Sequence, residues 1–442
     1  MSNRVLWRAL LILLAAAAAG CTEPGGRSGP DAPTGGDASP VDVPDSTVEA
    51  GSDAANDADL ADATTVDAPI DAPIDAPMDA TIDASASGQF RTVGALAQPR
   101  LQHAAALLPD GRVLVVGGIV RDLTDPEATW RPTAHAEVFD PTTELFSAVA
   151  PMALPRSRPR ATALADGRVL VTGAATVTTG FVATTEIFDP ATNTFVAGPD
   201  NLAVHRVHTA TRLADGRVLV AGESVEVFVP ASGNFQPLPP LNLLSPSHEA
   251  ARLANGRVLA SGGPHQGSSG GGTRDDAEEL DPATGVFAVT GSMATPRASH
   301  QLTALAGGGA LATGGYLGLG GAIEIFATAE VYDPTTRAFT PASMMTTSRT
   351  SHAAALLVDG RVLVTGGSSD GMGTAPDNMF ATVATAELFD PSTRTFSPTG
   401  TMATPRAGHT TTRLQGGRVL VVGGAAVLGG PVASPSAEVY QP

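Results

Sequence analysis

The chain reads PRLQHAAALLPDGRVLVVGG over residues 99–118, and this stretch decides the fold. An apolar run over residues 103–108 precedes Asp110-Gly111, and a second apolar run, Val113–Val116, follows it. Asp and Gly tolerate the positive φ of a tight hairpin turn, so we expect the two runs to pair as β-strands. The second run is β-branched and has no polar alternation, which predicts a strand that is buried on both faces.

Each copy of this stretch continues with two more predicted strands. Glu137–Phe139 forms the third strand, and Phe146 lies on the fourth. The residues between them, 140–143, read DPTT, in which Asp begins a turn and Pro fixes φ at its second position. No stretch after residue 88 shows a sustained helical period, so we expect each repeat to consist of four β-strands and no helix.

The unit recurs seven times between residue 89 and residue 442. The first glycine of the closing pair occurs at residues 117, 173, 222, 262, 314, 366 and 423. A spacing of about 50 residues indicates one supersecondary unit per repeat, as in a propeller. The predicted fold class is therefore all-β, a seven-bladed β-propeller of four-stranded blades over residues 89–442.

The two ends of the repeat region predict how the ring closes. The last copy stops at Pro442, directly after its third strand, whereas Phe90 lies before the first copy and matches the fourth strand. We expect residues 89–95 to complete the blade of residues 409–440, because this removes an exposed sheet edge.

The repeat resembles the kelch repeat of galactose-oxidase-like propellers. The residues that carry the resemblance are clearest in the sixth copy: Arg349, His352, Asp359-Gly360-Arg361-Val362-Leu363-Val364, Gly366-Gly367, Ala386-Glu387-Leu388-Phe389-Asp390-Pro391 and Phe396. Galactose oxidase uses copper and a tyrosine that is cross-linked to cysteine. Here Cys21 is the single cysteine and the tyrosines are Tyr316, Tyr332 and Tyr440, so we expect neither that activity nor any cofactor or metal.

The first 20 residues predict a lipoprotein signal peptide. Arg4 and Arg8 precede an apolar run over residues 9–19, and residues 18–21 read AAGC, which resembles a bacterial lipobox. Lipid on Cys21 would hold the protein on a membrane, at the outer membrane or cell surface. Plain secretion with an unrelated cysteine is the alternative.

Residues 21–88 comprise Cys21 and an Asp/Ala/Pro-rich linker. Residues 22–88 hold 13 Asp and 2 Glu against Arg27 alone, which is −14 of the net charge of −18. Such a segment cannot bury enough apolar surface to offset its ordering entropy, so we expect a disordered acidic tether.

Composition excludes several function classes. All 26 basic residues other than His are Arg, so no lysine is present to form a Schiff base. The net charge of −18 excludes a nucleic-acid partner, which needs a basic surface. One cysteine allows neither an intramolecular disulfide nor a thiolate metal cluster.

Two polar residues recur with the repeat and are expected to serve the fold. Histidine lies fourteen residues before the first glycine at His103, His208, His248, His300, His352 and His409. Glutamate recurs on the third strand at Glu137, Glu186, Glu226, Glu278, Glu330, Glu387 and Glu438. A ring of histidines around an axis is too wide to share one metal ion. Hydrogen bonds within each blade, with His or Arg as donor to Glu, are the expected role.

The candidate ligand site lies where the repeats differ. Loops after the double glycine vary greatly, and the third copy has Ser224 alone, which predicts a gap in the rim. The residues expected beside this gap are Trp130, Arg156, Arg158, Arg160, His205 and Arg206. A Trp can stack on a sugar and Arg can pair with carboxylates, so we expect an acidic glycan or acidic protein there. The alternatives are that Arg156 belongs to the repeat, that Trp130 only packs its loop, or that the acidic tether occupies the patch.

These features predict a monomeric, non-catalytic binding module that presents a protein- or glycan-binding face at the bacterial cell envelope. The alternative is a carbohydrate-active enzyme with an unrecognised site on the propeller face, and a third interpretation is an envelope spacer. An enzyme should show one asymmetric cluster of titratable groups with perturbed pKa values. A binding module should show an exposed patch without such a cluster.

Overall fold

The computed structural model describes residues 87–121, 130–173, 175–176, 180–205, 207–242, 248–265, 272–319, 322–369, 381–426 and 433–442. All regular structure in these ranges is β-strand, and no helix there is long and apolar enough to cross a bilayer. The predicted signal peptide, Cys21, nearly all of the acidic linker and Arg206 lie outside the described residues.

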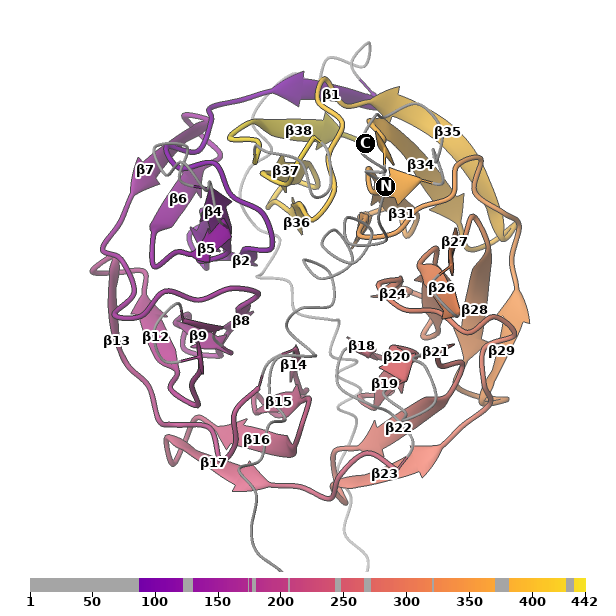
Figure 1. Cartoon of the computed structure of the whole chain (residues 1–442), viewed down its shortest axis with the longest axis horizontal. Coiled ribbons are helices and arrows are strands. Elements are labelled where there is room, and N and C mark those ends of the chain that lie inside the picture. The colour runs from indigo at the N-terminus through magenta and orange to yellow at the C-terminus, as the bar shows by residue number, and fades with distance from the viewer. Residues whose placement is uncertain are drawn as a thin grey trace, which may run out of the picture.

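Within the described residues, seven four-stranded antiparallel sheets stand in a ring around a central axis (Figure 1). Blades 1 to 3 are β2 (Ala104–Leu107), β3 (Val113–Val116), β6 (Ala136–Asp140), β7 (Leu145–Ala148); β8 (Arg160–Ala163), β9 (Val169–Thr172), β12 (Glu186–Asp189), β13 (Thr194–Ala197); β14 (Thr209–Arg212), β15 (Val218–Ala221), β16 (Val225–Val229), β17 (Asn234–Pro237). Blades 4 and 5 are β18 (Glu249–Arg252), β19 (Val258–Ser261), β22 (Ala277–Asp281), β23 (Val286–Val289); β24 (Gln301–Ala304), β25 (Ala310–Thr313), β28 (Ala329–Asp333), β29 (Ala338–Pro341). Blades 6 and 7 are β30 (Ala353–Leu356), β31 (Val362–Thr365), β34 (Thr385–Asp390), β35 (Thr395–Thr401); β36 (Thr410–Arg413), β37 (Val419–Val422), β38 (Ala437–Gln441), β1 (Gln89–Thr92). The predicted seven-bladed propeller is confirmed.

The second strand of every blade forms the core of the fold. All four residues of β3 are buried, and the same holds for β9, β15, β19, β25, β31 and β37. In β3, Val116 packs with Val169 of blade 2, whereas Val115 packs with Leu420 of blade 7. Each sheet is therefore covered on both faces by its neighbours, which explains why these strands lack polar alternation.

The ring closes as the sequence predicts. Strand β1 pairs antiparallel with β38, with Phe90 opposite Tyr440 and Arg91 opposite Val439. The rings of Phe90 and Tyr440 lie 4.8 Å apart, which repeats the Phe139–Phe146 contact of blade 1. The N-terminal strand thus completes the last blade and covers the edge of β38.

The double glycine forms the joint between adjacent blades. Gly423 has a φ of +65°, and a Cβ there would lie 2.7 Å from the carbonyl oxygen of Arg100 and 2.7 Å from the ring of His103. The N–H of Gly424 donates to the same Arg100 oxygen at 3.0 Å. Glycine is required because the arginine and histidine of the next blade pack directly against this turn and leave no room for a Cβ atom.

One face of the ring carries the variable loops, and we call it the loop face. Each innermost strand begins there and each second strand ends there, since the two are antiparallel. Five two-stranded hairpins stand at this face: β4 (Ile119–Arg121) with β5 (Trp130–Pro132), β10 (Ala175–Thr176) with β11 (Gly180–Phe181), β20 (Pro264–His265) with β21 (Gly272–Thr273), β26 (Tyr316–Leu319) with β27 (Ala322–Ile325), and β32 (Ser368–Ser369) with β33 (Ala381–Thr382).

Candidate functional site

The repeated arginine and glutamate form buried ion pairs within the blades. Nη2 of the arginine lies 2.6–3.0 Å from Oε1 of the glutamate in Arg100–Glu137, Arg156–Glu186, Arg297–Glu330, Arg349–Glu387 and Arg406–Glu438. All five arginines are 0% exposed. In blade 3, His205 takes the arginine's place, with Nε2 2.5 Å from Glu226. Two of the six candidate site residues, Arg156 and His205, are therefore placed inside blades, where each binds a carboxylate of its own blade.

The six recurring histidines are buried, and each forms a hydrogen bond to a neighbouring blade. Their Nε2 atoms lie 2.8–3.1 Å from a hydroxyl of the preceding blade, in the pairs His103–Thr410, His208–Thr172, His248–Thr209, His300–Ser261, His352–Thr313 and His409–Thr365. Burial lowers the pKa of His103 and His352 to about 3, so these rings are neutral. Of the two donors expected for the glutamates, arginine takes the position in five blades. The expectation is corrected for these six histidines, whose hydrogen bonds run to the preceding blade and not to a glutamate of their own blade.

Trp130 stands on β5 at the loop face. Its half-buried ring packs against Leu101, Ile119, Ala425 and Ala433, at the joint of blades 7 and 1. This contact covers apolar surface of the loop and of the neighbouring blade.

Arg158 and Arg160 lie at the loop-face end of the innermost strands. Arg160 opens β8, and its Nε donates to the carbonyl oxygen of His208 at 2.8 Å. Arg158 precedes this strand with a φ of 50°, and its Nε donates to Oε1 of Gln102 at 3.1 Å. Both side chains are partly exposed.

A belt of backbone hydrogen bonds holds the turns around Arg158. The N–H of Gln102 donates to Gly408, Gly408 donates to Ser351, and Ser351 donates to Ser299, at 3.0, 2.9 and 3.3 Å. Each of these residues precedes an innermost strand and has a positive φ. The belt runs from blade 5 through blades 6 and 7 to blade 1, and the Gln102 side chain extends it to Arg158 in blade 2.

Two further titratable groups interact with these arginines. Glu249 opens β18 in blade 4, and burial raises its pKa while the charge of Arg160 opposes the shift. Tyr316 opens β26 in blade 5, and burial raises its pKa while Arg158 opposes the shift. Burial, followed by the charge of Arg160, lowers the pKa of Arg158 to about 10. We call Arg158, Arg160, Glu249 and Tyr316 the axial cluster.

The axial cluster breaks the symmetry of the ring. The other innermost strands begin with the uncharged residues Ala104, Thr209, Gln301, Ala353 and Thr410. Only blades 2 and 4 place a charge at this position, as Arg160 and Glu249. Sequence reasoning found both arginines and missed Glu249 and Tyr316, although the departure of Glu249 from the small or polar residues of the other copies was a readable signal.

Comparison with known proteins identifies a shared fold. No protein-family model and no curated protein sequence matches the chain. Among solved structures, it is similar to a fungal alcohol oxidase of the AA5 family, solved in complex with copper, with a TM-score of 0.61 and 17% identity over 80% of this chain and 76% of that chain. At this identity the likeness establishes a galactose-oxidase-like β-propeller fold.

This comparison corrects the predicted function. We expected a non-catalytic binding module and no enzyme, whereas the propeller that the chain resembles is that of a catalyst. The asymmetric cluster of titratable groups is also the feature expected of an enzyme. The alternative prediction, a carbohydrate-active enzyme with a site on the propeller face, agrees better with the comparison.

The described side chains do not fit a copper centre built on tyrosine and histidine. Tyr332 donates to Glu279 and Tyr440 contacts Thr399, both within the blades, and the recurring histidines are held by hydroxyls. Among the described residues, no group of three or more His, Cys, Asp or Glu side chains could hold a metal ion. Cys21 lies outside them.

Proposed function

We propose that the chain is a carbohydrate-active enzyme whose acid–base site is the axial cluster. The observation that carries this proposal is an asymmetry of the ring: of the seven innermost strands, only those of blades 2 and 4 begin with a charged residue, Arg160 and Glu249. The charge of Arg160 acts on the pKa of Glu249, and the charge of Arg158 acts on the pKa of Tyr316. Structural ion pairs of this fold recur in blade after blade, whereas these residues occur once. Titratable residues that have shifted pKa values and that occur once in a repetitive fold are typical of a functional site.

Glu249 supplies the proton in this proposal. A carboxyl group with a raised pKa stays protonated at a higher pH than an ordinary glutamate and can act as a general acid. The charge of Arg160 opposes this rise in the pKa. In the hydrolysis of a glycosidic bond, Glu249 would protonate the oxygen of the leaving sugar while a water molecule adds to the anomeric carbon and releases a proton to the solvent, from which Glu249 is protonated again.

Arg158 and Arg160 define the substrate class. Two guanidinium groups at one end of the axis attract a carboxylate, which arginine binds in a bidentate manner. Tyr316, whose pKa is raised, remains a phenol and can donate a hydrogen bond to the same sugar. The proposed substrate is therefore a polysaccharide that contains uronic acids.

The test compares acidic and neutral polysaccharides. The full chain should release reducing ends from polyuronides such as pectate or alginate, and few from amylose. Replacing Arg158 or Arg160 with Gln should lower kcat/KM by about tenfold or more, as for the loss of a charge-assisted hydrogen bond. Arg168→Gln is the matched control, because this arginine of blade 2 pairs with Asp166 in an exposed turn. Equal rates on acidic and neutral polymers, or unchanged rates in both axial variants, would contradict the proposal.

The repeat type and the location of the protein belong to the same proposal. The blades are of the kelch type, supported by the Arg, His, Asp-Gly-Arg and double-glycine positions that recur in the copies. The protein is a lipoprotein anchored through Cys21 outside the cytoplasm, at the outer membrane or cell surface, supported by the lipobox-like residues 18–21. It acts as a monomer on a glycan partner at the end of an acidic tether.

A further inference from the structure

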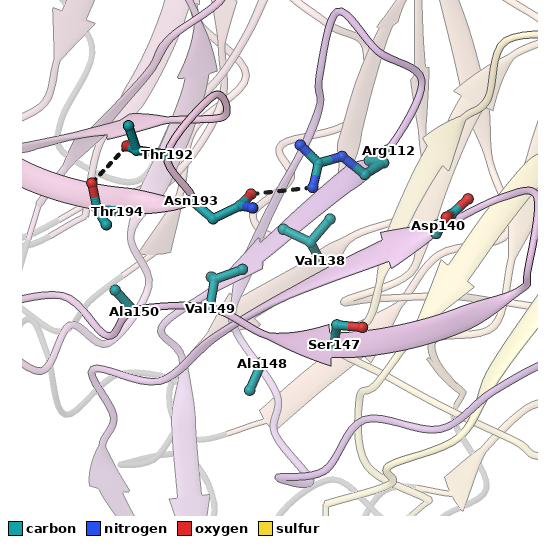
Figure 2. A pocket seen from close by; sticks show the side chains of 10 residues that line it. All are labelled: Arg112, Val138, Asp140, Ser147, Ala148, Val149, Ala150, Thr192, Asn193 and Thr194. Atoms are coloured by element: carbon teal, nitrogen blue, oxygen red, sulfur yellow. Dashed lines mark hydrogen bonds between the residues drawn. The ribbon is translucent and has the colours of Figure 1, made fainter.

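A second feature lies away from the loop face, in the outer grooves between blades. In three of these grooves, the arginine that follows the first hairpin turn binds the turn between the third and fourth strands of the next blade: Arg112 of blade 1, Arg217 of blade 3 and Arg418 of blade 7. Between blades 1 and 2 the groove is a pocket of about 470 Å³, lined by Arg112, Val138, Asp140, residues 147–150 and residues 192–194 (Figure 2).

The equivalent groove between blades 3 and 4 is much smaller, at about 130 Å³. Arg217 lies there as Arg112 does in blade 1, and donates to Pro282 at 2.8 Å. Leu238 replaces Val149 and reaches toward Gly285, so that a Cβ on this glycine would lie 3.0 Å from it. The larger side chain fills the space.

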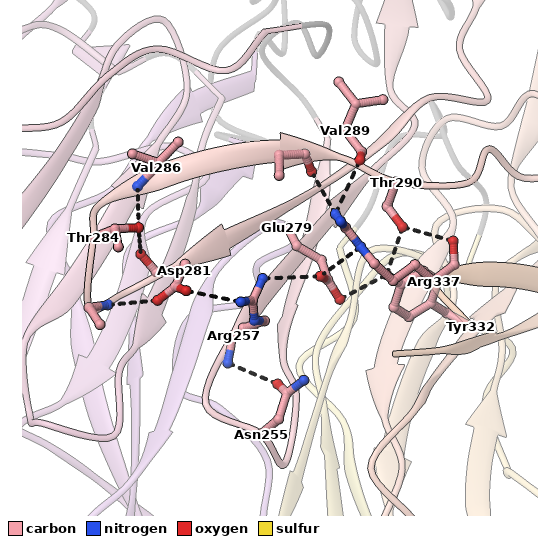
Figure 3. A network of polar contacts seen from close by, with 12 residues as sticks. Asn255, Arg257, Glu279, Asp281, Thr284, Val286, Val289, Thr290, Tyr332 and Arg337 are labelled. Atoms are coloured by element: carbon pink, nitrogen blue, oxygen red, sulfur yellow. Dashed lines mark hydrogen bonds and ion pairs between the residues drawn. The ribbon is translucent and has the colours of Figure 1, made fainter. Parts of the chain in front are cut away.

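The equivalent groove between blades 4 and 5 is filled by charged side chains (Figure 3). Glu279 occupies the position of Val138, and Arg337 occupies that of Asn193, with a φ of 55° against 54°. The carboxylate of Glu279 accepts a hydrogen bond from Tyr332 and lies 3.4 Å from Arg337 and 3.6 Å from Arg257. Between blades 7 and 1, Glu144 takes the turn position and binds Arg91 and Arg418.

The pocket between blades 1 and 2 has Val149 where the joint of blades 3 and 4 has Leu238, and it has Val138 and Asn193 where the joint of blades 4 and 5 has Glu279 and Arg337. Its volume lies in the range of small-molecule sites, roughly 300–1,000 Å³. The backbone of the repeat does not require this opening. The joint that contains Leu238 and the joint that contains Glu279 and Arg337 have the same backbone arrangement. The N–H of Ala150 donates to Asn193 as the N–H of Gly291 donates to Arg337.

The arginine that lines this pocket is already bonded to the protein, so the pocket does not favour an anionic ligand. Nε of Arg112 donates to Asp110, Nη1 donates to Oδ1 of Asn193 at 3.1 Å, and Nη2 donates to the carbonyl oxygen of Pro190. Asp140 accepts the N–H of Thr142 through one oxygen. Asp110 thus neutralises the cation of Arg112, and the lining offers both hydrogen-bond donors and acceptors.

The remaining groups fit a ring that carries hydroxyls. The bond from Arg112 to Oδ1 fixes the orientation of the Asn193 amide, and within the described residues Nδ2 has no hydrogen-bond partner. Ser147, Thr192 and Thr194 add hydroxyls, while Val138 and Val149 form an apolar wall. We propose that this pocket binds a neutral sugar residue, with Asn193 donating to a hydroxyl and the valines contacting the C–H face. This site is separate from the axial cluster and does not depend on it.

The test uses saturation-transfer NMR on the full chain, with methyl glucoside and methyl galactoside as probes. At least one probe should receive saturation from the wild-type protein. Asn193→Gly should weaken its binding by about tenfold, through loss of an oriented hydrogen bond. This variant keeps the turn intact, because Gly233 and Gly285 occupy the same position in blades 3 and 4 with positive φ. The double variant Val138→Glu/Asn193→Arg copies the filled groove of blades 4 and 5 and should abolish binding.

Two controls keep the outcome specific. Arg394→Gly removes a side chain from the same turn position in blade 6, where φ is 56°, and should bind the probe as wild type does. Arg158→Gln should also bind normally, which separates this pocket from the axial cluster. No saturation of either probe, or equal saturation in wild type and Asn193→Gly, would overturn the proposal.

Discussion

At the scale of single residues, the fold depends on charges that are buried in pairs. Arg349 is 0% exposed and donates to Glu387 at 2.9 Å and to the carbonyl oxygens of Gly366 and Thr385, both at 2.8 Å. One guanidinium therefore joins the segment before β30 to the end of β31 and to β34, and it neutralises its carboxylate partner. The same arrangement occurs in four other blades, so that five of the 26 arginines form buried pairs of this kind.

Breaking this pair from one side should be costly. Arg349→Ala leaves Glu387 buried without its cation, and we expect a loss of about 3–5 kcal/mol in the free energy of unfolding. The double variant Arg349→Met/Glu387→Met should lose less, because no charge is left unpaired. Denaturant unfolding of both variants measures this, and a single variant as stable as the double would contradict the interpretation.

The buried histidines predict how stability changes with pH. Nε2 of His352 contacts Thr313, while Nδ1 is buried and has no partner within the described residues. Its folded pKa of about 3 lies below the ordinary value of 6.5, so between these values the unfolded chain binds a proton that the folded chain rejects. This contribution to stability is present above pH 6.5 and is lost as the pH falls toward 3.

The variant His352→Gln should therefore show a flatter acid limb. One histidine contributes a slope of up to about 1.4 kcal/mol per pH unit in this window. Unfolding free energies of wild type and variant, measured at several pH values below 6.5, give this difference directly. Parallel slopes would show that His352 takes up a proton in the folded state.

At the scale of elements, the joint between blades depends on one glycine. Gly423→Ala should combine the cost of φ +65° with a clash against Arg100 and His103. Gly416→Ala in the same blade is the control, because its φ is +88° and a Cβ would meet nothing within 4 Å. We expect about 1–2 kcal/mol for the control and clearly more for Gly423→Ala, measured by thermal unfolding. Equal losses would mean that the joint can open to admit a methyl group.

The elements could be predicted because they repeat. Each copy supplies the same turn residues and the same β-branched run, and agreement among seven copies outweighs the ambiguity of any short strand. The sequence did not show which residue binds the buried glutamate, since both His and Arg recur and both are hydrogen-bond donors. Blade 3 is the blade in which a histidine does bind the glutamate, because His205 stands in place of the arginine and contacts Glu226.

At the scale of the whole molecule, the candidate site could be predicted only in part. Arg158 and Arg160 stand out because they depart from the repeat, yet their neighbours Glu249 and Tyr316 lie about two and three blades farther along the chain. Which residues meet across an axis depends on the three-dimensional ring, and periodicity alone does not give it. Residues that depart from the repeat point to a site once the structure shows where each of them lies around the axis of the ring.

Closure of the ring makes a prediction about the N-terminal strand. A chain that begins at residue 93 lacks β1 and exposes the edge of β38, whereas a chain that begins at residue 87 keeps their pairing. We expect the shorter chain to melt at a lower temperature and to self-associate through the free edge. Calorimetry and light scattering of the two chains measure this, and identical behaviour would show that β1 does not hold the ring closed.

The most direct test of the proposed enzyme is the turnover of a polyuronide by the full chain with Glu249→Gln. Removing a general acid should lower kcat by about a hundredfold or more. Glu324→Gln should retain the wild-type rate, because Glu324 is an exposed carboxylate on β27 of the same face. If the Glu249→Gln chain is folded and turns over the polymer as fast as the Glu324→Gln chain, the axial cluster is not the acid–base site.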